Sequence, residues 1–373
     1  MLKSRFRKIS AYALGAAALM SVSSQAQALT FVLTFTAGTS AQAQAGFQAA
    51  ANRWSSIFSD NATINLTVGT AALGAGILGQ AGSVTTNFSY TAFKTALTAD
   101  ITSASDALGV ANLDPGASFG MLINRTSDNP NGSGSATPYL DLAGANNQQV
   151  RLTNANAKAL GLAPTLGTNS LCIGNCDAGI QFSSNFAFDY DPSDGITAGQ
   201  FDFIGIAMHE IGHALGFISG VDILDGNSPP VNGPFTANQF TFVSSLDMFR
   251  YSALSAASGV IDWTADTRAK CFSLDGGTTL GACFSTGRNF GDGQQASHWK
   301  DSLGLGIMDP TAGAGELLTV SANDRMAFDV IGWNLAAAPA VPEPGTWMMM
   351  LAGFGLVGGA VRRRRSTQIA TLA

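Results

Sequence analysis

Two histidines and a glutamate lie within five consecutive residues of this 373-residue chain, in the sequence HEIGH at 209–213. Apolar residues recur around this motif every three or four positions, which predicts a helix over 203–218 that ends near Gly220. Histidines four positions apart project from one helix face, so both rings can bind a single Zn²⁺. Burying these three side chains without partners would cost several kcal/mol. The motif therefore predicts a metal site, with Glu210 as the base that takes a proton from an attacking water.

A catalytic zinc usually has three protein ligands and keeps one position for water. In the extended pattern H-E-x-x-H-x-x-G-x-x-H the third histidine would stand at 219, where this chain has Ser219. A hydroxyl is a poor zinc ligand. The remaining candidates are Asp222, Asp225 and His298, the only other histidine in the sequence.

The sequence around His298 favours that residue. The block ASHWKD at 296–301 is followed by GIMDP at 306–310. Together with HEIGHALGF at 209–217, these blocks resemble the leishmanolysin family of metzincin zinc proteases over about residues 200–335. In that family the third histidine follows a long insertion, in a His-Trp-Lys context, shortly before a methionine turn.

The resemblance implies a zinc-dependent endopeptidase that hydrolyses protein or peptide substrates. Carried over residue by residue, it implies the zinc ligands His209, His213 and His298, with Glu210 as general base and Met308 in the turn beneath the metal. The implied fold is α+β: a mixed twisted sheet with an active-site helix, and a lower C-terminal subdomain with the methionine turn and a C-terminal helix. The chain departs from some metzincins because no tyrosine follows Met308.

Other functions and a second metal are compatible with the same residues. A non-catalytic, zinc-stabilised matrix or adhesion protein suits the many small residues and few charges, although a structural zinc site has no need of Glu210. Hydrolysis of a non-peptide amide would use the same motif. The acidic segment DYDPSDG at 189–195 favours a solvated turn, with Ca²⁺ as the alternative, since the EF-hand pattern is absent.

Periodicity predicts the elements that must position this site. Ser321 and Asp324 form a capping-box pair at the start of a helix after the methionine turn. Alternating and helical patterns elsewhere predict strands at 29–35, 62–68, 119–123, 150–152 and 180–182, helices at 41–58 and 90–98, and a loop at 124–137.

Both ends of the chain are predicted to be targeting signals. A basic start, an apolar run and Ala26-Gln27-Ala28 make residues 1–28 a secretory signal peptide. At the other end, VPEP at 341–344, an apolar segment at 347–361 and four arginines at 362–365 resemble the PEP-CTERM sorting signal of Gram-negative bacteria. That resemblance implies a transient inner-membrane anchor that an exosortase removes, leaving the protein at the cell surface or outside the cell. A permanent single-span anchor is the alternative.

Charge and cysteine content agree with an exported protein. Without the eight basic residues of the two ends and Glu343, residues 29–340 carry 11 basic and 24 acidic groups, a net of −13, which excludes nucleic acid as the main partner. Local disulfides Cys172–Cys176 and Cys271–Cys283 are the simplest pairing, with a thiolate zinc site as the alternative. The predicted domains are 1–28, 29–220, 221–335 and 336–373.

Overall fold

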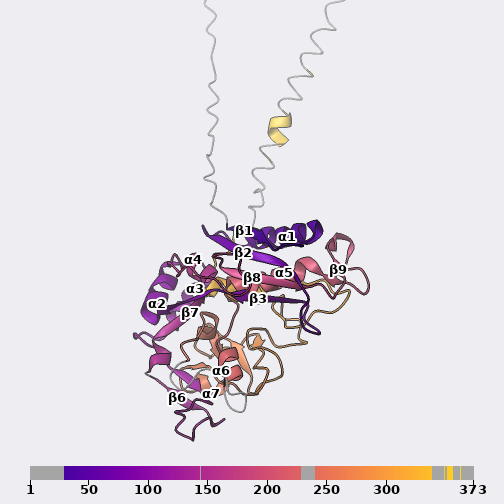
Figure 1. The fold of residues 1–373 in the computed structure, drawn as a ribbon. Helices are drawn as coiled ribbons and strands as arrows, with labels where there is room; N and C mark the ends of the chain where they lie inside the picture. The colour runs from indigo at the N-terminus through magenta and orange to yellow at the C-terminus, as the bar shows by residue number, and fades with distance from the viewer. Residues whose placement is uncertain are drawn as a thin grey trace, which may run out of the picture.

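The computed structural model describes residues 29–142, 144–227 and 240–337, and in the tail residues 348, 351–355 and 362. These residues form an α+β fold with several small sheets, as predicted (Figure 1). The α-helices are α1 (Ala41–Ile57), α2 (Tyr90–Ala99), α3 (Ala104–Ala111), α4 (Asn154–Ala159), α5 (Phe203–Leu215), α6 (Val221–Asn227), α7 (Ala253–Ala256) and α8 (Ala322–Val330). The strands are β1 (Thr30–Phe35), β2 (Thr63–Ala71), β3 (Gly79–Ser83), β4 (Thr85–Ser89), β5 (Met121–Ile123), β6 (Tyr139–Asp141), β7 (Gln149–Thr153), β8 (Ala178–Ser183), β9 (Phe188–Asp189), β10 (Phe201–Asp202), β11 (Arg250–Tyr251), β12 (Ile261–Asp262), β13 (Lys270–Phe272) and β14 (Cys283–Phe284).

The largest sheet in the described part of the chain is mixed and has the order β1-β2-β8-β3. The first three strands run parallel, and β3 pairs antiparallel with β8 at the outer edge. Ile64, Leu66 and Val68 on β2 are at most 1% exposed, so the predicted alternation is confirmed. An edge strand has a neighbour on one side only, which leaves its other side to face the rest of the molecule.

Aromatic packing fixes helix α5 against the sheet. The rings of Phe47 on α1, Phe182 on β8 and Phe203 on α5 lie 4.5–5.0 Å apart, centroid to centroid. Two turns further along α1, Trp54 donates its indole N–H to the carbonyl of Met208 at 3.0 Å. Offset aromatic contacts of this kind add to the free energy of burial. Helix α5 is therefore held by both the sheet and α1.

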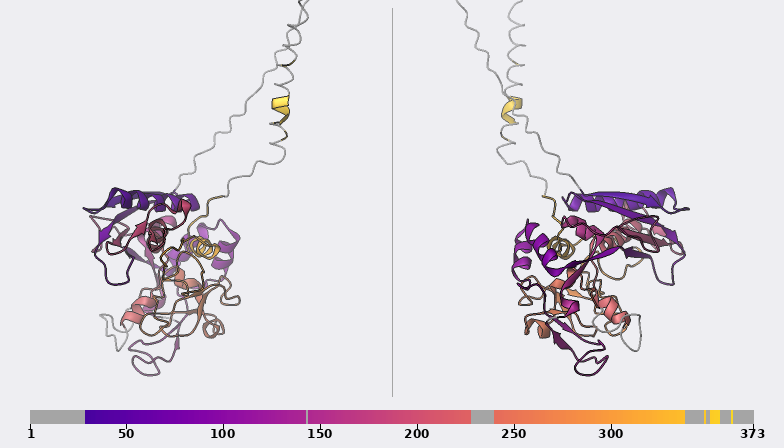
Figure 2. Two further views of the ribbon diagram at one scale, coloured as in Figure 1. Left: turned by 90° about the vertical axis from the view of Figure 1, so that its right-hand side faces the viewer. Right: turned by 60° about the vertical axis from the view of Figure 1, so that its left-hand side comes forward.

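The lower part of the molecule has short strands and long connections (Figure 2). Both predicted disulfides are present, and Cys271 and Cys283 are paired residues of β13 and β14. Strand β5 pairs with β12, so one small sheet joins segments from both sides of residue 220. The third predicted zinc ligand reaches the site from this lower part.

The last residues of the described body, 334–336, are bound to the segment at the end of α1. Phe58 and Leu335 form an antiparallel bridge. Ser59 donates its N–H to the Asn334 carbonyl, and Ala336 donates its N–H to the Ile57 carbonyl, both at 2.8 Å. We call these contacts the terminal clip.

The targeting signals lie largely outside the described residues. The predicted signal peptide at 1–28 lies outside them entirely, as does most of the predicted tail at 341–365. No helix in the part of the chain that the structure describes has both the length and the apolar run needed to cross a bilayer.

Candidate metal centre

Helix α5 carries the HEIGH motif, and its start agrees with the prediction. The Asp202 carboxylate caps it by accepting the N–H of Gly205 at 2.8 Å. The predicted end near Gly220 is wrong: the helix stops at Leu215 because Gly216 adopts a φ of +121°, which favours glycine. Gly220 has a different role, since a Cβ there would lie 2.0 Å from the carbonyl oxygen of Phe242.

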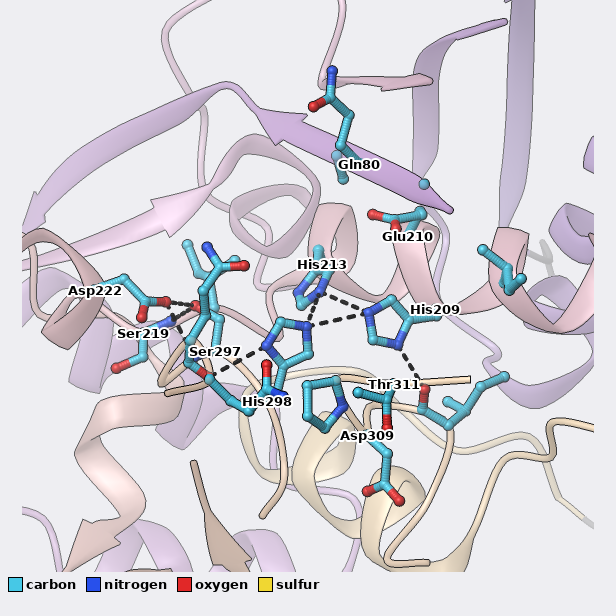
Figure 3. Close-up of a pocket in the computed structure, with 18 of the residues that line it drawn as sticks. Gln80, His209, Glu210, His213, Ser219, Asp222, Ser297, His298, Asp309 and Thr311 are labelled. Carbon is cyan, nitrogen blue, oxygen red and sulfur yellow. Dashed lines mark hydrogen bonds between the residues drawn. The ribbon is translucent and has the colours of Figure 1, made fainter. Parts of the chain in front are cut away.

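Three imidazole rings converge at this helix (Figure 3). The Nε2 atom of His213 lies 3.1 Å from that of His209 and 3.1 Å from that of His298, and the third separation is 3.3 Å. No other group of three or more metal-ligating side chains converges in this way among the described residues. The structure thus brings together the three predicted ligands, although 84 residues separate the second from the third.

Hydrogen bonds fix which ring nitrogen carries the proton. His209 Nδ1 lies 2.7 Å from the Ile307 carbonyl oxygen, His213 Nδ1 lies 2.7 Å from that of Phe217, and His298 Nδ1 lies 3.3 Å from that of Gln295. A carbonyl oxygen can only accept, so each Nδ1 donates and each neutral ring keeps a lone pair on Nε2. The three Nε2 atoms therefore cannot hydrogen bond to one another.

Three converging lone pairs fit a cation. Burial lowers the pKa of His209 and of His298, and lowers the pKa of His213 to about 3, so the rings stay neutral at pH 7. Tetrahedral Zn²⁺ with bonds of 2.0–2.1 Å holds its nitrogen ligands about 3.3–3.4 Å apart. The observed separations of 3.1–3.3 Å match this value closely. The donor set and its spacing both fit zinc.

The carboxylate of Glu210 points to the same cavity. Glu210 is 6% exposed, and no hydrogen bond joins its carboxylate to a described residue. Burial raises the pKa of its carboxyl to about 8. Gly79 on the edge strand leaves room for it, because a Cβ at that position would lie 2.8 Å from Glu210 Oε1. A carboxylate with a raised pKa that faces a cavity beside three ligands is suited to proton transfer.

The rival ligand candidates bind backbone groups instead. Asp222 accepts the N–H of Ala296 at 2.6 Å and the N–H of Ser297 at 3.1 Å, and it also accepts the Ser297 hydroxyl. Asp225 accepts the N–H groups of the 289–290 segment at 2.8 and 2.9 Å. Asp222 therefore holds the two residues immediately before His298.

We expect Asp222→Asn to weaken zinc binding about tenfold, because an amide offers one acceptor where two backbone N–H groups need acceptors. Residues that orient a metal ligand typically change metal affinity by about 10- to 100-fold when replaced. Competition against a chromophoric chelator would measure the Kd. Asp194→Asn, at an exposed turn, is the control. Equal affinity in the Asp222 and Asp194 variants would contradict the positioning role.

A buried ion pair, missed from the sequence, supports the same loop. Arg250 and Asp247 are fully buried, with Nε 3.3 Å from Oδ1. Arg250 also donates to the carbonyls of Ala296 at 2.5 Å and Ser285 at 3.3 Å. Asp247 accepts the Ser219 hydroxyl at 2.6 Å. The pair thus joins the chain leaving α5 to the chain approaching His298.

The turn around Met308 lies directly under α5. Met308 is fully buried, and its carbonyl accepts the N–H of Trp299 at 3.0 Å. Asp324 forms the predicted capping box with Ser321 and also accepts the Ile307 N–H and the Trp299 indole N–H, both at 2.8 Å. One carboxylate therefore fixes α8, the methionine turn and the neighbour of His298. The second role of Asp324 has no signal in the sequence.

Gly212→Ala is expected to lower the free energy of unfolding by up to about 2 kcal/mol. Alanine favours a helix by about 1 kcal/mol over glycine, but a Cβ at Gly212 would lie 2.5 Å from Met308 Sδ, and overpacking costs about 1–3 kcal/mol. Urea denaturation would measure the change. Gly226→Ala on α6, where a Cβ meets nothing within 4 Å, is the matched control. A Gly212 variant as stable as that control would contradict the close packing.

A cavity of about 710 Å³ opens onto the three histidines and Glu210. It is lined by β3 on one side and by the turn after Met308 on another. The acidic turn lies elsewhere: Asp189 accepts the N–H groups of Asp191 and Thr197 at 2.9 and 2.8 Å. Hydrogen bonds lower the pKa of Asp189. A calcium site there stays a prediction.

Comparison with known proteins identifies the tail. Residues 340–365 match the model of the PEP-CTERM protein-sorting motif, which confirms that part of the prediction. The motif implies recognition by exosortase-type sorting machinery and indicates an exported, surface-sorted protein. No curated protein matches the chain, and no solved structure matches it.

Proposed function

We propose that this protein is a zinc-dependent endopeptidase whose ligands are His209, His213 and His298. The observation that carries the proposal is the convergence of three Nε2 lone pairs within 3.1–3.3 Å beside the Glu210 carboxylate, at an open cavity. A zinc bound only for stability would normally have four protein ligands and no open position. The cavity and the carboxylate that lines it favour catalysis over the scaffold alternative.

Each group has a role that follows from its placement. Zinc, when bound, would supply a Lewis acid that lowers the pKa of a water and stabilises negative charge on the substrate carbonyl oxygen. Glu210 accepts the proton of the attacking water and delivers it to the leaving amine. The Nδ1 bonds to the carbonyls of Ile307 and Phe217 hold His209 and His213 with their Nε2 atoms toward the cavity.

The edge strand offers a way to bind an extended substrate. Strand β3 pairs with β8 on one side and lines the cavity. Backbone groups on the outer side of an edge strand can pair with a peptide as an added strand. This favours a peptide substrate over a compact non-peptide amide.

The resemblance to the leishmanolysin family supports the same proposal. The resemblance rests on the helix motif, on the third histidine after a long insertion, and on Met308, which is buried beneath α5. We infer that the chain is a leishmanolysin-like protease that is sorted through its PEP-CTERM tail. Its substrates would be proteins at or beyond the cell surface.

Removal of the metal is expected to stop peptide hydrolysis reversibly. The purified chain, loaded with Zn²⁺, would be incubated with unfolded casein, and new peptide N-termini would be identified by mass spectrometry. A chelator should abolish cleavage, and added Zn²⁺ should restore it, because chelation removes the ion and leaves the three histidine side chains chemically unchanged. Bound zinc without cleavage of any protein would contradict the endopeptidase and favour the scaffold.

A further inference from the structure

An arginine lies in the same cavity as the three histidines. Arg151 on β7 lines the cavity together with Phe242, beyond the end of β3. Its backbone N–H donates to the Val243 carbonyl at 2.8 Å, which fixes the start of the side chain. Its guanidinium carbon lies 4.2 Å from the centroid of the Phe242 ring. The aromatic ring therefore supports one face of the guanidinium inside the cavity.

Arg151 lacks the partners that other buried arginines have. Arg250 pairs with Asp247, and Arg125 donates its Nε to the Ala265 carbonyl at 2.8 Å. The Nε of Arg151 is buried and has no hydrogen-bond partner, and no ion pair joins Arg151 to a described residue. Burial lowers its pKa, and no carboxylate opposes that effect. A partly desolvated cation without an anion is a costly arrangement unless a ligand supplies the anion.

We propose that Arg151 binds a carboxylate of the peptide substrate, so that the cleft selects peptides that present a carboxylate at this position; this rests on the proposed endopeptidase function. A guanidinium with one face covered by an aromatic ring keeps its edge, with a fork of N–H donors, for a bidentate carboxylate. The carboxylate is that of an Asp or Glu side chain or of the peptide's C-terminus. Both present the same planar pair of oxygens.

Strand β3 indicates where along the substrate this carboxylate binds. Gly79 lies against Glu210, whereas Ser83, at the other end of the strand, donates its hydroxyl to the His213 carbonyl at 3.3 Å. Thr85 follows on β4, the strand that pairs with β7, and it lines the same cavity as Arg151. An extended peptide advances about 3.3 Å per residue. The bound carboxylate therefore lies several residues from the cleaved bond, on the side toward Ser83.

A binding experiment can test this without cleavage. The zinc-loaded full chain with Glu210→Gln would be titrated into three fluorescein-labelled pools of random octapeptides: one with a fixed central Glu and an amidated C-terminus, one with Gln and an amidated C-terminus, and one with Gln and a free C-terminus. Fluorescence anisotropy gives each Kd. One of the two pools with a carboxylate should bind at least about tenfold tighter than the amidated Gln pool. Tighter binding of the Glu pool would identify a side-chain carboxylate, and tighter binding of the Gln pool with a free C-terminus would identify the terminal carboxylate.

Variants distinguish specific binding of the carboxylate at Arg151 from general electrostatic attraction to the basic residues of the cavity. In the Glu210→Gln background, Arg151→Ala should remove the preference, and Arg151→Lys should keep only part of it, because lysine retains the charge without the fork. Arg288 is exposed and lines the same cavity, so Arg288→Ala is the matched control and should keep the preference. Equal binding of all pools, no binding of any pool, or equal loss in the Arg151 and Arg288 variants would overturn the proposal.

Cleavage by the parent chain distinguishes failure of the Arg151 proposal from failure of the proposed endopeptidase function. The same pools would be incubated with the zinc-loaded parent and analysed by mass spectrometry. Arg151-dependent binding without cleavage would overturn the endopeptidase function alone. Cleavage without a preference for a carboxylate would overturn the Arg151 site alone.

Discussion

Glu210→Gln is expected to lower kcat/KM for peptide hydrolysis by about 10²- to 10⁴-fold, the usual contribution of a general acid–base group. Glutamine has the same shape but cannot accept the proton of the attacking water. Zinc content should stay equal to that of the parent, since the ligands are His209, His213 and His298. Kinetics on a fluorogenic peptide and metal analysis of the same samples would measure both.

A matched control exists in the same cavity. Glu316 also lines it but is exposed, so Glu316→Gln should retain most of the activity. Retained hydrolysis in the Glu210 variant would show that another group is the base. Loss of zinc together with activity would instead show that Glu210 holds the metal site together.

Glu210→Gln, which is expected to lower activity, should raise the free energy of unfolding at high pH. Burial raises the pKa of the Glu210 carboxyl from 4.5 to about 8 in the metal-free fold. The folded parent therefore keeps a proton that the unfolded chain has lost, and its free energy of unfolding falls as the pH rises from about 4.5 to 8. Glutamine does not titrate, so the metal-free variant should be the more stable of the two at pH 8. Urea denaturation at pH 5 and pH 8 would measure the difference.

His298→Ala is expected to weaken zinc binding by about 10²- to 10³-fold. Zinc sites with four ligands bind with about 10–16 kcal/mol, or roughly 3–4 kcal/mol for each ligand. The Nε2 atom of His298 is 3.1–3.3 Å from the other two, so no other described side chain can take its place without moving. Competition with a chromophoric chelator would give the Kd.

The size of this effect separates ligands from positioning residues. The loss in His298→Ala should exceed the tenfold loss expected for Asp222→Asn. If the Asp222 variant loses more zinc than the His298 variant, Asp222 is the ligand and the observed hydrogen bonds of its carboxylate must break on metal binding. Equal zinc affinity in parent and His298→Ala would remove the three-histidine site.

The sequence predicted the regular elements well where packing is periodic. Phe47, Ala51 and Trp54 share one side of α1 and are fully buried, and Phe58, directly after the helix, is 1% exposed. Strand β3 was missed because its sequence, GQAGS, has no alternation. Its small residues instead allow a close approach to α5, which the glycine at position 79 makes possible. Such a strand is specified by its neighbours rather than by its own pattern.

The candidate site was likewise predicted where its residues are close in sequence and missed where they are far apart. The spacing of His209 and His213 is local, so a helical repeat alone indicates a shared metal. His298 was assigned from a family resemblance, because no spacing rule spans 84 residues. The bonds of Asp222, Asp247 and Asp324 to distant backbone groups could not be predicted, since a carboxylate in a sequence looks the same whether it faces solvent or a buried N–H.

The terminal clip marks the point at which the contacts of the folded body end, just before the sorting motif. The hydrogen bond from Ala336 to the Ile57 carbonyl lies four residues before the sorting motif, which begins at residue 340. A cut within the motif would therefore break none of the described contacts of the body. The clip lies at the end of α1, at residues 57–59, so a pull on the tail would act first on α1 and on the chain that leads into β2. Removal of the tail within the motif would thus leave the geometry of the candidate metal centre unchanged.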